Sequence, residues 1–133
     1  MTDNNTMSND PINLLLVDDE EGFVNVLTKR LAKRGINVTA TLSGSDAVAI
    51  FNKNRFDIVL LDLKMEFMDG IDVLKVLKDM DPDIPVIMIS GHGSREEAQK
   101  GIALGASAYL PKPYELDSLV EKIRGIVSNK VGR

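Results

Sequence analysis

The sequence predicts an α/β domain of the doubly wound type, in which a parallel sheet of five strands lies between two layers of helices. Three short apolar runs, at residues 14–17, 58–61 and 86–89, are unbroken rather than alternating, which is typical of strands covered on both faces. The stretches between the strands carry apolar residues at helical spacing. A length of 133 residues suits one such domain and is too short for two ordinary ones.

Helical spacing of apolar residues locates the helices. Phe23, Leu27 and Leu31 lie four residues apart, and Gly35 follows where a helix ordinarily ends. Residues 94–97, Ser-Arg-Glu-Glu, have the pattern of a capping box and predict the start of a later helix. The other stripes comprise Ile71, Leu74 and Leu77 in one helix and Leu116, Leu119, Val120, Ile123 and Val127 in the closing one.

Two weaker strands, expected at 36–41 and 106–110, complete an alternation of five strands with five helices. Right-handed crossovers between parallel strands place helices on both faces of the sheet, which gives a three-layer sandwich. In such sheets ligands bind at the carboxyl ends of the strands. We expect residues 12–129 to form the domain, between a flexible polar leader at 1–11 and a short tail at 130–133.

Composition excludes several classes of function. Sixteen Lys and Arg against twenty Asp and Glu give a net charge of −4, which disfavours direct binding to nucleic acid. The chain has no cysteine and a single histidine, His92, so disulfides, thiolate zinc sites and sites built from several histidines are excluded. No stretch approaches the ~20 apolar residues of a membrane span, and no apolar signal segment opens the chain. We therefore expect a cytoplasmic protein without a membrane partner.

Polar side chains follow four of the predicted strands. Asp18-Asp19-Glu20 comes after the first strand, Asp62 after the third and Ser90 at the end of the fourth, while Lys112 lies in the loop after the fifth. Two carboxylates about 4 Å apart repel by about 4 kcal/mol at an effective dielectric near 20, so this cluster requires cations. Lys112 supplies one positive charge, and the hard oxygen ligands suit Mg²⁺ or Mn²⁺.

This set of residues suits phosphoryl transfer. A carboxylate beside a divalent ion and a lysine can attack a phosphoryl group and form an acyl phosphate. Asp62 is the best candidate for the nucleophile because it stands alone at the end of its strand, whereas Asp18 and Asp19 are placed as a chelating pair. Ser90 offers a hydroxyl donor to a phosphoryl oxygen.

Six motifs then identify a family by their order and spacing. They are Leu15-Leu16-Val17-Asp18-Asp19-Glu20, Val59-Leu60-Leu61-Asp62-Leu63-Lys64-Met65, Met68-Asp69-Gly70, Ile87-Met88-Ile89-Ser90-Gly91-His92-Gly93, Gly105-Ala106 and Lys112-Pro113-Tyr114. With these motifs, the chain from about residue 12 to residue 129 resembles the receiver domain of bacterial two-component response regulators, and within that family the chemotaxis regulators. The resemblance implies a sheet of order 2-1-3-4-5, the flavodoxin-like arrangement.

The resemblance also implies a metal site and a phosphoacceptor. Asp62 is expected to accept the phosphoryl group. Asp19, Asp62 and the main-chain carbonyl of Lys64 are the expected ligands of Mg²⁺ or Mn²⁺, while Asp18 is expected to act largely through metal-bound water. Lys112 is expected to pair with the phosphoryl group.

A switch and a set of partners follow from the same resemblance. Ser90 is expected to turn toward the phosphorylated site, and Tyr109 to change between exposed and inward rotamers with it. The surface that moves is expected to be the fourth helix, fifth strand and fifth helix, roughly residues 94–129. A sensor histidine kinase or a phosphotransfer protein would donate the phosphoryl group, and a downstream protein or an attached output domain would read the surface. A homodimer formed on phosphorylation is also compatible with the family, whose members are regulatory rather than enzymes in their own right.

The sequence departs from the usual family pattern in the loop after Asp62. Glu66 stands where a proline is usual, which predicts a less rigid loop and adds an acid near the site. Lys64 and His92 occupy the two variable positions that tune hydrolysis of the acyl phosphate in receiver domains. Lys112-Pro113 is the usual place of a cis peptide bond in the family.

Three other functions fit parts of the sequence. A phosphatase of the haloacid-dehalogenase type also forms an aspartyl phosphate, but it places its nucleophile after the first strand and needs a cap, for which this chain has no spare length. A flavodoxin-like flavin binder would need Ser, Thr or Gly amides rather than the acids at 18–20. An interaction module that is never phosphorylated is disfavoured by the complete set Asp18, Asp19, Asp62, Ser90 and Lys112.

Overall fold

A computed structural model describes residues 11–66, 69–91 and 95–131. The predicted leader at 1–11 therefore lies outside the described residues except for Pro11, and so do Met68, His92, Gly93 and Ser94. The start of the predicted capping box falls in the same gap.

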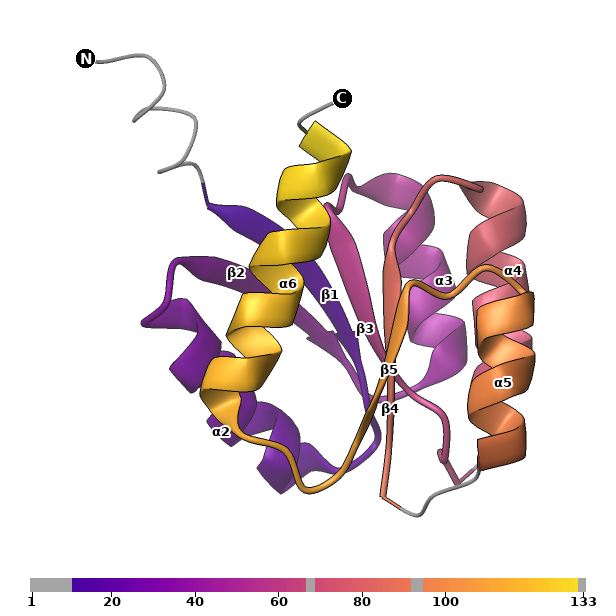
Figure 1. Cartoon of the computed structure of the whole chain (residues 1–133), viewed down its shortest axis with the longest axis horizontal. Coiled ribbons are helices and arrows are strands. Elements are labelled where there is room, and N and C mark those ends of the chain that lie inside the picture. Colours follow the sequence, from indigo (N-terminus) through magenta and orange to yellow (C-terminus); the bar gives the residue numbers. More distant parts are fainter. Residues whose placement is uncertain (1–10, 67–68, 92–94, 132–133) are drawn as a thin grey trace.

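In the described part of the chain, five strands alternate with five helices (Figure 1). In chain order they are β1 (Ile12–Val17), α2 (Glu21–Ala32), β2 (Ile36–Thr41), α3 (Gly44–Lys53), β3 (Ile58–Asp62), α4 (Gly70–Met80), β4 (Val86–Ser90), α5 (Arg95–Ala103), β5 (Ala108–Pro111) and α6 (Leu116–Val131).

The strands form one parallel sheet of order β2-β1-β3-β4-β5, which confirms the predicted doubly wound fold and the order implied by the resemblance. The chain runs outward from β1 to the edge strand β2 and then returns to β3 on the other side of β1, so the strand order reverses between β1 and β3. Val17 pairs with Leu61 at this point. The residues that directly follow the pair, Asp18 and Asp62, therefore lie side by side at the carboxyl edge of the sheet.

Alternate residues of the strands pack into two cores, one on each face of the sheet. Leu15, Val59 and Met88 face the layer of α3, α4 and α5, while Leu16, Leu60 and Ile89 face α2 and α6. All six are fully buried. Because both faces are covered, the strands could be unbroken apolar runs, which explains the sequence pattern that predicted them.

Two element boundaries differ from the prediction. β5 begins at Ala108 rather than at Ala106, because the Ala106 N–H donates to the Gly101 carbonyl and closes the end of α5 instead of pairing in the sheet. The preceding Gly105 has φ of 108°, a conformation that suits glycine. The closing helix α6 continues to Val131, so the first two residues of the predicted tail at 130–133 are helical.

Within the described ranges, no helix combines the length and apolar character that crossing a membrane requires.

Candidate functional site

The polar residues predicted at the strand ends come together at the carboxyl edge of the sheet. Asp18 and Asp62 are buried, with relative exposures of 0% and 3%. Ser90, the last residue of β4, is also buried, and Lys112 follows β5. Four separate strands thus deliver the residues that the sequence had placed at one edge.

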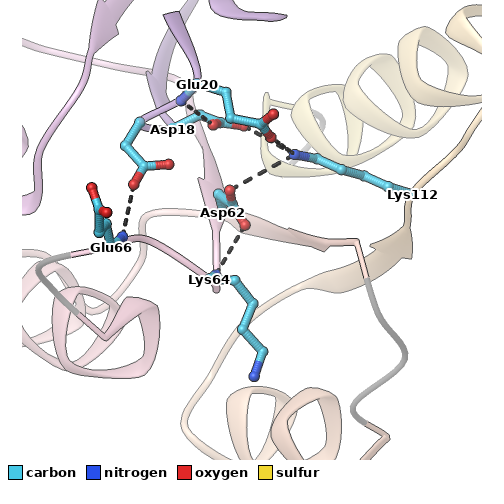
Figure 2. A network of polar contacts seen from close by, with 7 residues as sticks. Asp18, Glu20, Asp62, Lys64, Glu66 and Lys112 are labelled. Atoms are coloured by element: carbon cyan, nitrogen blue, oxygen red, sulfur yellow. Dashed lines mark hydrogen bonds and ion pairs between the residues drawn. The ribbon is translucent and has the colours of Figure 1, made fainter.

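The side chain of Lys112 points toward the acidic residues, and its ammonium contacts Asp18, Glu20 and Asp62 (Figure 2). Its Nζ is 3.3 Å from Asp18 Oδ2, 3.3 Å from Glu20 Oε1 and 3.7 Å from Asp62 Oδ2. Its side chain is 18% exposed, so the ammonium exchanges most of its hydration for carboxylate oxygens. One lysine therefore partly neutralises three acids from two strand ends.

Backbone amides fix the two buried carboxylates. The Glu20 N–H donates to Asp18 Oδ1 at 2.9 Å, and the Lys64 N–H donates to Asp62 Oδ1 at 3.0 Å. In both residues the second oxygen, Oδ2, faces Lys112. The two acids are thus held in the same way, with one oxygen on the loop that follows the strand and one on the lysine.

The site holds more carboxylates than positive charges, and this excess, together with burial, affects the pKa values of its groups. Burial, and to a lesser extent the charges of Asp18 and Asp19, together raise the pKa of Asp62 to about 6, against the lowering effect of the Lys64 amide and of Lys112. Burial likewise raises the pKa of Asp18. Burial alone would lower the pKa of Lys112, but Asp18 and Asp62 outweigh it and leave this pKa raised.

Glu20 belongs to the acidic group around Lys112, a role that the sequence analysis did not assign to it. Together with Asp18 and Asp62 it forms a group whose ligand oxygens all lie within 4.8 Å of one another. Glu20 occupies the N-cap position of α2 without capping the helix through its side chain, which reaches Lys112 instead. The acidic run at 18–20 was the signal for this role, but acids after a strand are usually read as caps.

Asp19, the middle residue of the acidic run, contacts the loop after β3 rather than Lys112. Its Oδ2 accepts a hydrogen bond of 2.7 Å from the Glu66 N–H, across 47 positions of sequence. Asp19 is absent from the group of converging oxygens, although its charge acts on Asp62. The Glu66 amide therefore ties the loop after β3 to the acidic run after β1, and a proline at this position could not donate this bond.

The main chain and the side chain of Lys64 contact different parts of the molecule. Its main-chain N–H belongs to the site, whereas its side chain points away from Asp62 (Figure 2) and its Nζ lies 3.0 Å from Glu97 Oε1 on α5. The ion pair connects the loop after β3 with the helix that opens the predicted output surface. The structure thus brings Lys64 to the site by its backbone.

Ser90 and Tyr109 lie on neighbouring strands. The Ser90 carbonyl accepts a 2.7 Å hydrogen bond from the Lys112 N–H, which joins the end of β4 to the loop after β5. Tyr109 is half-buried and pairs with Met88 of β4. Its hydroxyl is buried and has no hydrogen-bond partner among the described residues. The Lys112-Pro113 peptide bond is cis, as the resemblance implied.

An apolar groove of about 450 Å³ opens beside Lys112, between α2 and the loop after β5. Phe23 of α2 and Tyr114 line it together with Lys112 and Pro113. The Tyr114 hydroxyl is buried without a hydrogen-bond partner in the part of the chain that the structure describes. Burial, and then the charges of Asp18 and Asp62, raise the pKa of this phenol.

Fold and site together define a class of protein: a doubly wound domain that carries an acidic pocket with a buried lysine at the topological switch point. Three carboxylates, Asp18, Glu20 and Asp62, face one ammonium, and their oxygens are ligands that a divalent cation accepts. The donor set therefore fits a divalent metal cation, and the pocket is consistent with a phosphoacceptor site.

The chain belongs to the response regulator receiver domain family, whose model matches residues 14–124. It is 35% identical over 117 residues to the transcriptional regulatory protein GlrR of Escherichia coli K12, covering 88% of this chain and 26% of that protein. It is 32% identical over 117 residues to the response regulator MprA of Mycobacterium sp. strain KMS, covering 88% of this chain and 51% of that protein. The chain thus spans between about a quarter and a half of these relatives.

Solved structures agree with this family. A CheY-like receiver domain from Methanospirillum hungatei superposes with a TM-score of 0.88 at 25% identity, covering 92% of this chain and 98% of that one. A receiver domain from Clostridium thermocellum gives a TM-score of 0.85 at 30% identity, with 90% and 96% covered. The chain is therefore a regulatory phosphoacceptor domain of two-component signalling rather than a classical enzyme, which confirms the resemblance and replaces the phosphatase and flavin-binding alternatives.

Proposed function

We propose that this domain is a switch that accepts a phosphoryl group on Asp62 and passes the signal on through its surface. The observation that carries the proposal is the setting of the Asp62 carboxylate at the end of β3. One of its oxygens is fixed by the Lys64 amide, and the other faces the Lys112 ammonium at 3.7 Å. A phosphoryl group on that second oxygen would therefore lie beside the Lys112 ammonium.

The proposed reaction is an in-line displacement. Asp62 Oδ2 attacks the phosphorus of a phosphohistidine, the P–N bond breaks as the P–O bond forms, and the leaving imidazole keeps the electron pair of the broken bond. Asp62 must be ionised to attack, and its pKa of about 6 leaves the carboxylate as the main form at neutral pH. Lys112 would balance the negative charge that the phosphoryl oxygens bring.

A divalent cation, Mg²⁺ or in its place Mn²⁺, completes the proposed site. Asp19, Asp62 and the Lys64 carbonyl are the proposed ligands, with Asp18 acting through water, and the converging oxygens support adding Glu20 to this set. When bound, such an ion neutralises phosphoryl oxygens during transfer. The excess of carboxylates over lysine at this edge supports the same assignment.

For the output, we propose that Ser90 and Tyr109 relay the change at Asp62 to the surface formed by α5, β5 and α6. The buried Tyr109 hydroxyl, which has no partner in the described residues, supports an alternative rotamer for this side chain. Ser90 stands at the end of the strand that pairs with β5, and its carbonyl already contacts the Lys112 amide. A shift at the site would thus reach β5 directly.

The family implies a histidine kinase as the donor, and the longer relatives carry output domains. We propose that a sensor histidine kinase or a phosphotransfer protein phosphorylates this domain in the cytoplasm. A downstream protein or an attached output domain would read the result, with a homodimer as one form of the output. Residues 12–129 are the proposed signalling unit. We expect no direct binding of nucleic acid by this unit, because the net charge of the chain is −4.

Intact mass spectrometry after incubation with acetyl phosphate and Mg²⁺ tests the proposal. We expect one phosphoryl adduct that disappears in Asp62→Asn and in the presence of EDTA. Asp79→Asn is the matched control, because Asp79 is an exposed carboxylate near the C-terminal end of α4. If neither acetyl phosphate nor a phosphorylated histidine kinase gives an adduct, the domain is instead an interaction module that is not phosphorylated.

A further inference from the structure

Phe23 contacts the lysine of the site from α2, the helix whose N-cap is Glu20. The residue lies in the first turn of α2, and its ring centroid is 4.4 Å from Lys112 Nζ. This distance is well within the range of about 6 Å over which the face of an aromatic ring attracts an ammonium ion. The sequence pattern had placed Phe23 only in the apolar stripe of the helix.

The ring of Phe23 is itself held by a neighbour of the lysine. Tyr114 packs against it edge to face, with ring centroids 6.4 Å apart and an interplanar angle of 86°. Lys112 and Tyr114 flank Pro113, so one loop contacts the ring through two side chains. This arrangement fixes the ring relative to the loop after β5.

An aromatic ring is a different kind of partner for the ammonium than a carboxylate. Asp18 and Glu20 accept N–H bonds from Lys112, and Asp62 forms an ion pair with it, so these carboxylates compete with an incoming phosphoryl group for the ammonium. The ring attracts the same charge through its face without offering an oxygen. Its contact can therefore persist while the N–H groups exchange a carboxylate oxygen for a phosphoryl oxygen.

We propose that Phe23 is a positioning residue for phosphoryl transfer, which holds the Lys112 ammonium at the acidic cluster through a cation–π contact. This inference rests on the proposed function of Asp62 as the phosphoacceptor. A lysine has a flexible side chain of four methylene carbons, so without the ring the ammonium samples more positions and is more hydrated. The fraction of molecules with the ammonium at Asp62 falls, and transfer slows in proportion.

The test compares two substitutions of the same residue with acetyl phosphate as the donor, so that binding of a kinase does not enter. Phe23→Leu keeps an apolar side chain but removes the ring face, and we expect it to slow adduct formation about three- to tenfold. Phe23→Tyr keeps the ring and should retain the rate of the unaltered protein. Phe56→Leu is the control, because Phe56 stacks on Phe51 outside the site, and its loss should leave the rate unchanged.

A spectroscopic measurement separates positioning from a general loss of structure. The ring current of Phe23 should shift the NMR signals of the Lys112 Cε protons, and Phe23→Leu should remove this shift while Phe23→Tyr keeps it. Equal rates in Phe23→Leu and the unaltered protein, or equal slowing in both Phe23 variants, would overturn the inference while the function of Asp62 stands. Failure of the unaltered protein to form any Asp62-dependent adduct would overturn both.

Discussion

Replacing the proposed phosphoacceptor by its amide should make the folded protein more stable. Asp62 is 4% exposed in its side chain, and burial raises its pKa from the ordinary 3.8 to about 6. A raised pKa means that the folded state disfavours the carboxylate form relative to the unfolded state. The amide side chain of the Asp62→Asn variant would carry no such charge, and its oxygen can still accept the bond from the Lys64 N–H.

The size of the gain follows from the two pKa values. The difference between 3.8 and about 6, at about 1.4 kcal/mol for each pH unit, corresponds to about 3 kcal/mol at pH 8, where Asp62 is ionised in both states. The destabilisation of the folded state by the Asp62 carboxylate is absent well below pH 3.8, grows between pH 3.8 and 6, and is complete above about pH 6. It therefore amounts to about 1 kcal/mol at pH 4.5. At pH 8 the expected gain raises the melting temperature by about 10 °C for a domain of this size.

Urea denaturation in EDTA at pH 8 and pH 4.5 measures both values. EDTA is needed because a bound divalent ion would stabilise the carboxylate and reduce the difference. Asp79→Asn serves as the matched control and should change the stability by less than about 0.5 kcal/mol at either pH, since Asp79 is exposed. An Asp62→Asn variant that is no more stable at pH 8, or whose gain is the same at both pH values, would refute the argument from burial.

The same site supports three further predictions. The ¹³C signal of the Asp62 carboxyl carbon should titrate near pH 6 in EDTA and at lower pH in Mg²⁺, and a metal-free midpoint near 4 would contradict the burial of this charge. Lys112→Ala should leave the fold intact, because protonation of Asp62 relieves the repulsion. Lys112→Ala should lower the free energy of unfolding by about 2 kcal/mol at pH 8, as measured by urea denaturation. The substitution should also uncouple the phosphorylated site from its output, and persistent signalling in this variant would disprove that expectation. Gly70→Ala should cost about 3 kcal/mol or more and slow phosphorylation, because the new Cβ would lie 2.5 Å from Leu63 Cα and 2.7 Å from the Asp62 carbonyl oxygen. Gly22→Ala, which meets nothing within 4 Å, is its control, and equal melting temperatures of the two variants would argue against the contact.

The fold was predictable from the sequence because its strongest signals are local. Unbroken apolar runs occur in strands that are covered on both faces, and the carboxyl ends of parallel strands must share one edge. This reasoning alone placed Asp18, Asp62 and Lys112 together. The start of β5 was less predictable, since Ala106 has the same apolar character whether it pairs in the sheet or closes a helix.

Details of the site that depend on side-chain direction were beyond the sequence. Glu20 follows two other acids, and only the path of its side chain from the N-cap of α2 to Lys112 distinguishes it from a solvated helix start. Phe23 satisfies the apolar spacing of α2, which conceals its contact with the ammonium. In both cases the residue type was compatible with an ordinary structural role, and a distant residue decided the actual one.

The hydrogen bond from the Glu66 amide to Asp19 makes the loop after β3 responsive to its surroundings. A proline in place of Glu66 would stiffen that loop through covalent geometry, which is indifferent to solution conditions. An amide bonded to a carboxylate is stiff only while the carboxylate is available. A divalent cation bound to Asp19 would compete for the same oxygen, so the stiffness of this loop would depend on the magnesium concentration in a way that the stiffness of a proline loop cannot.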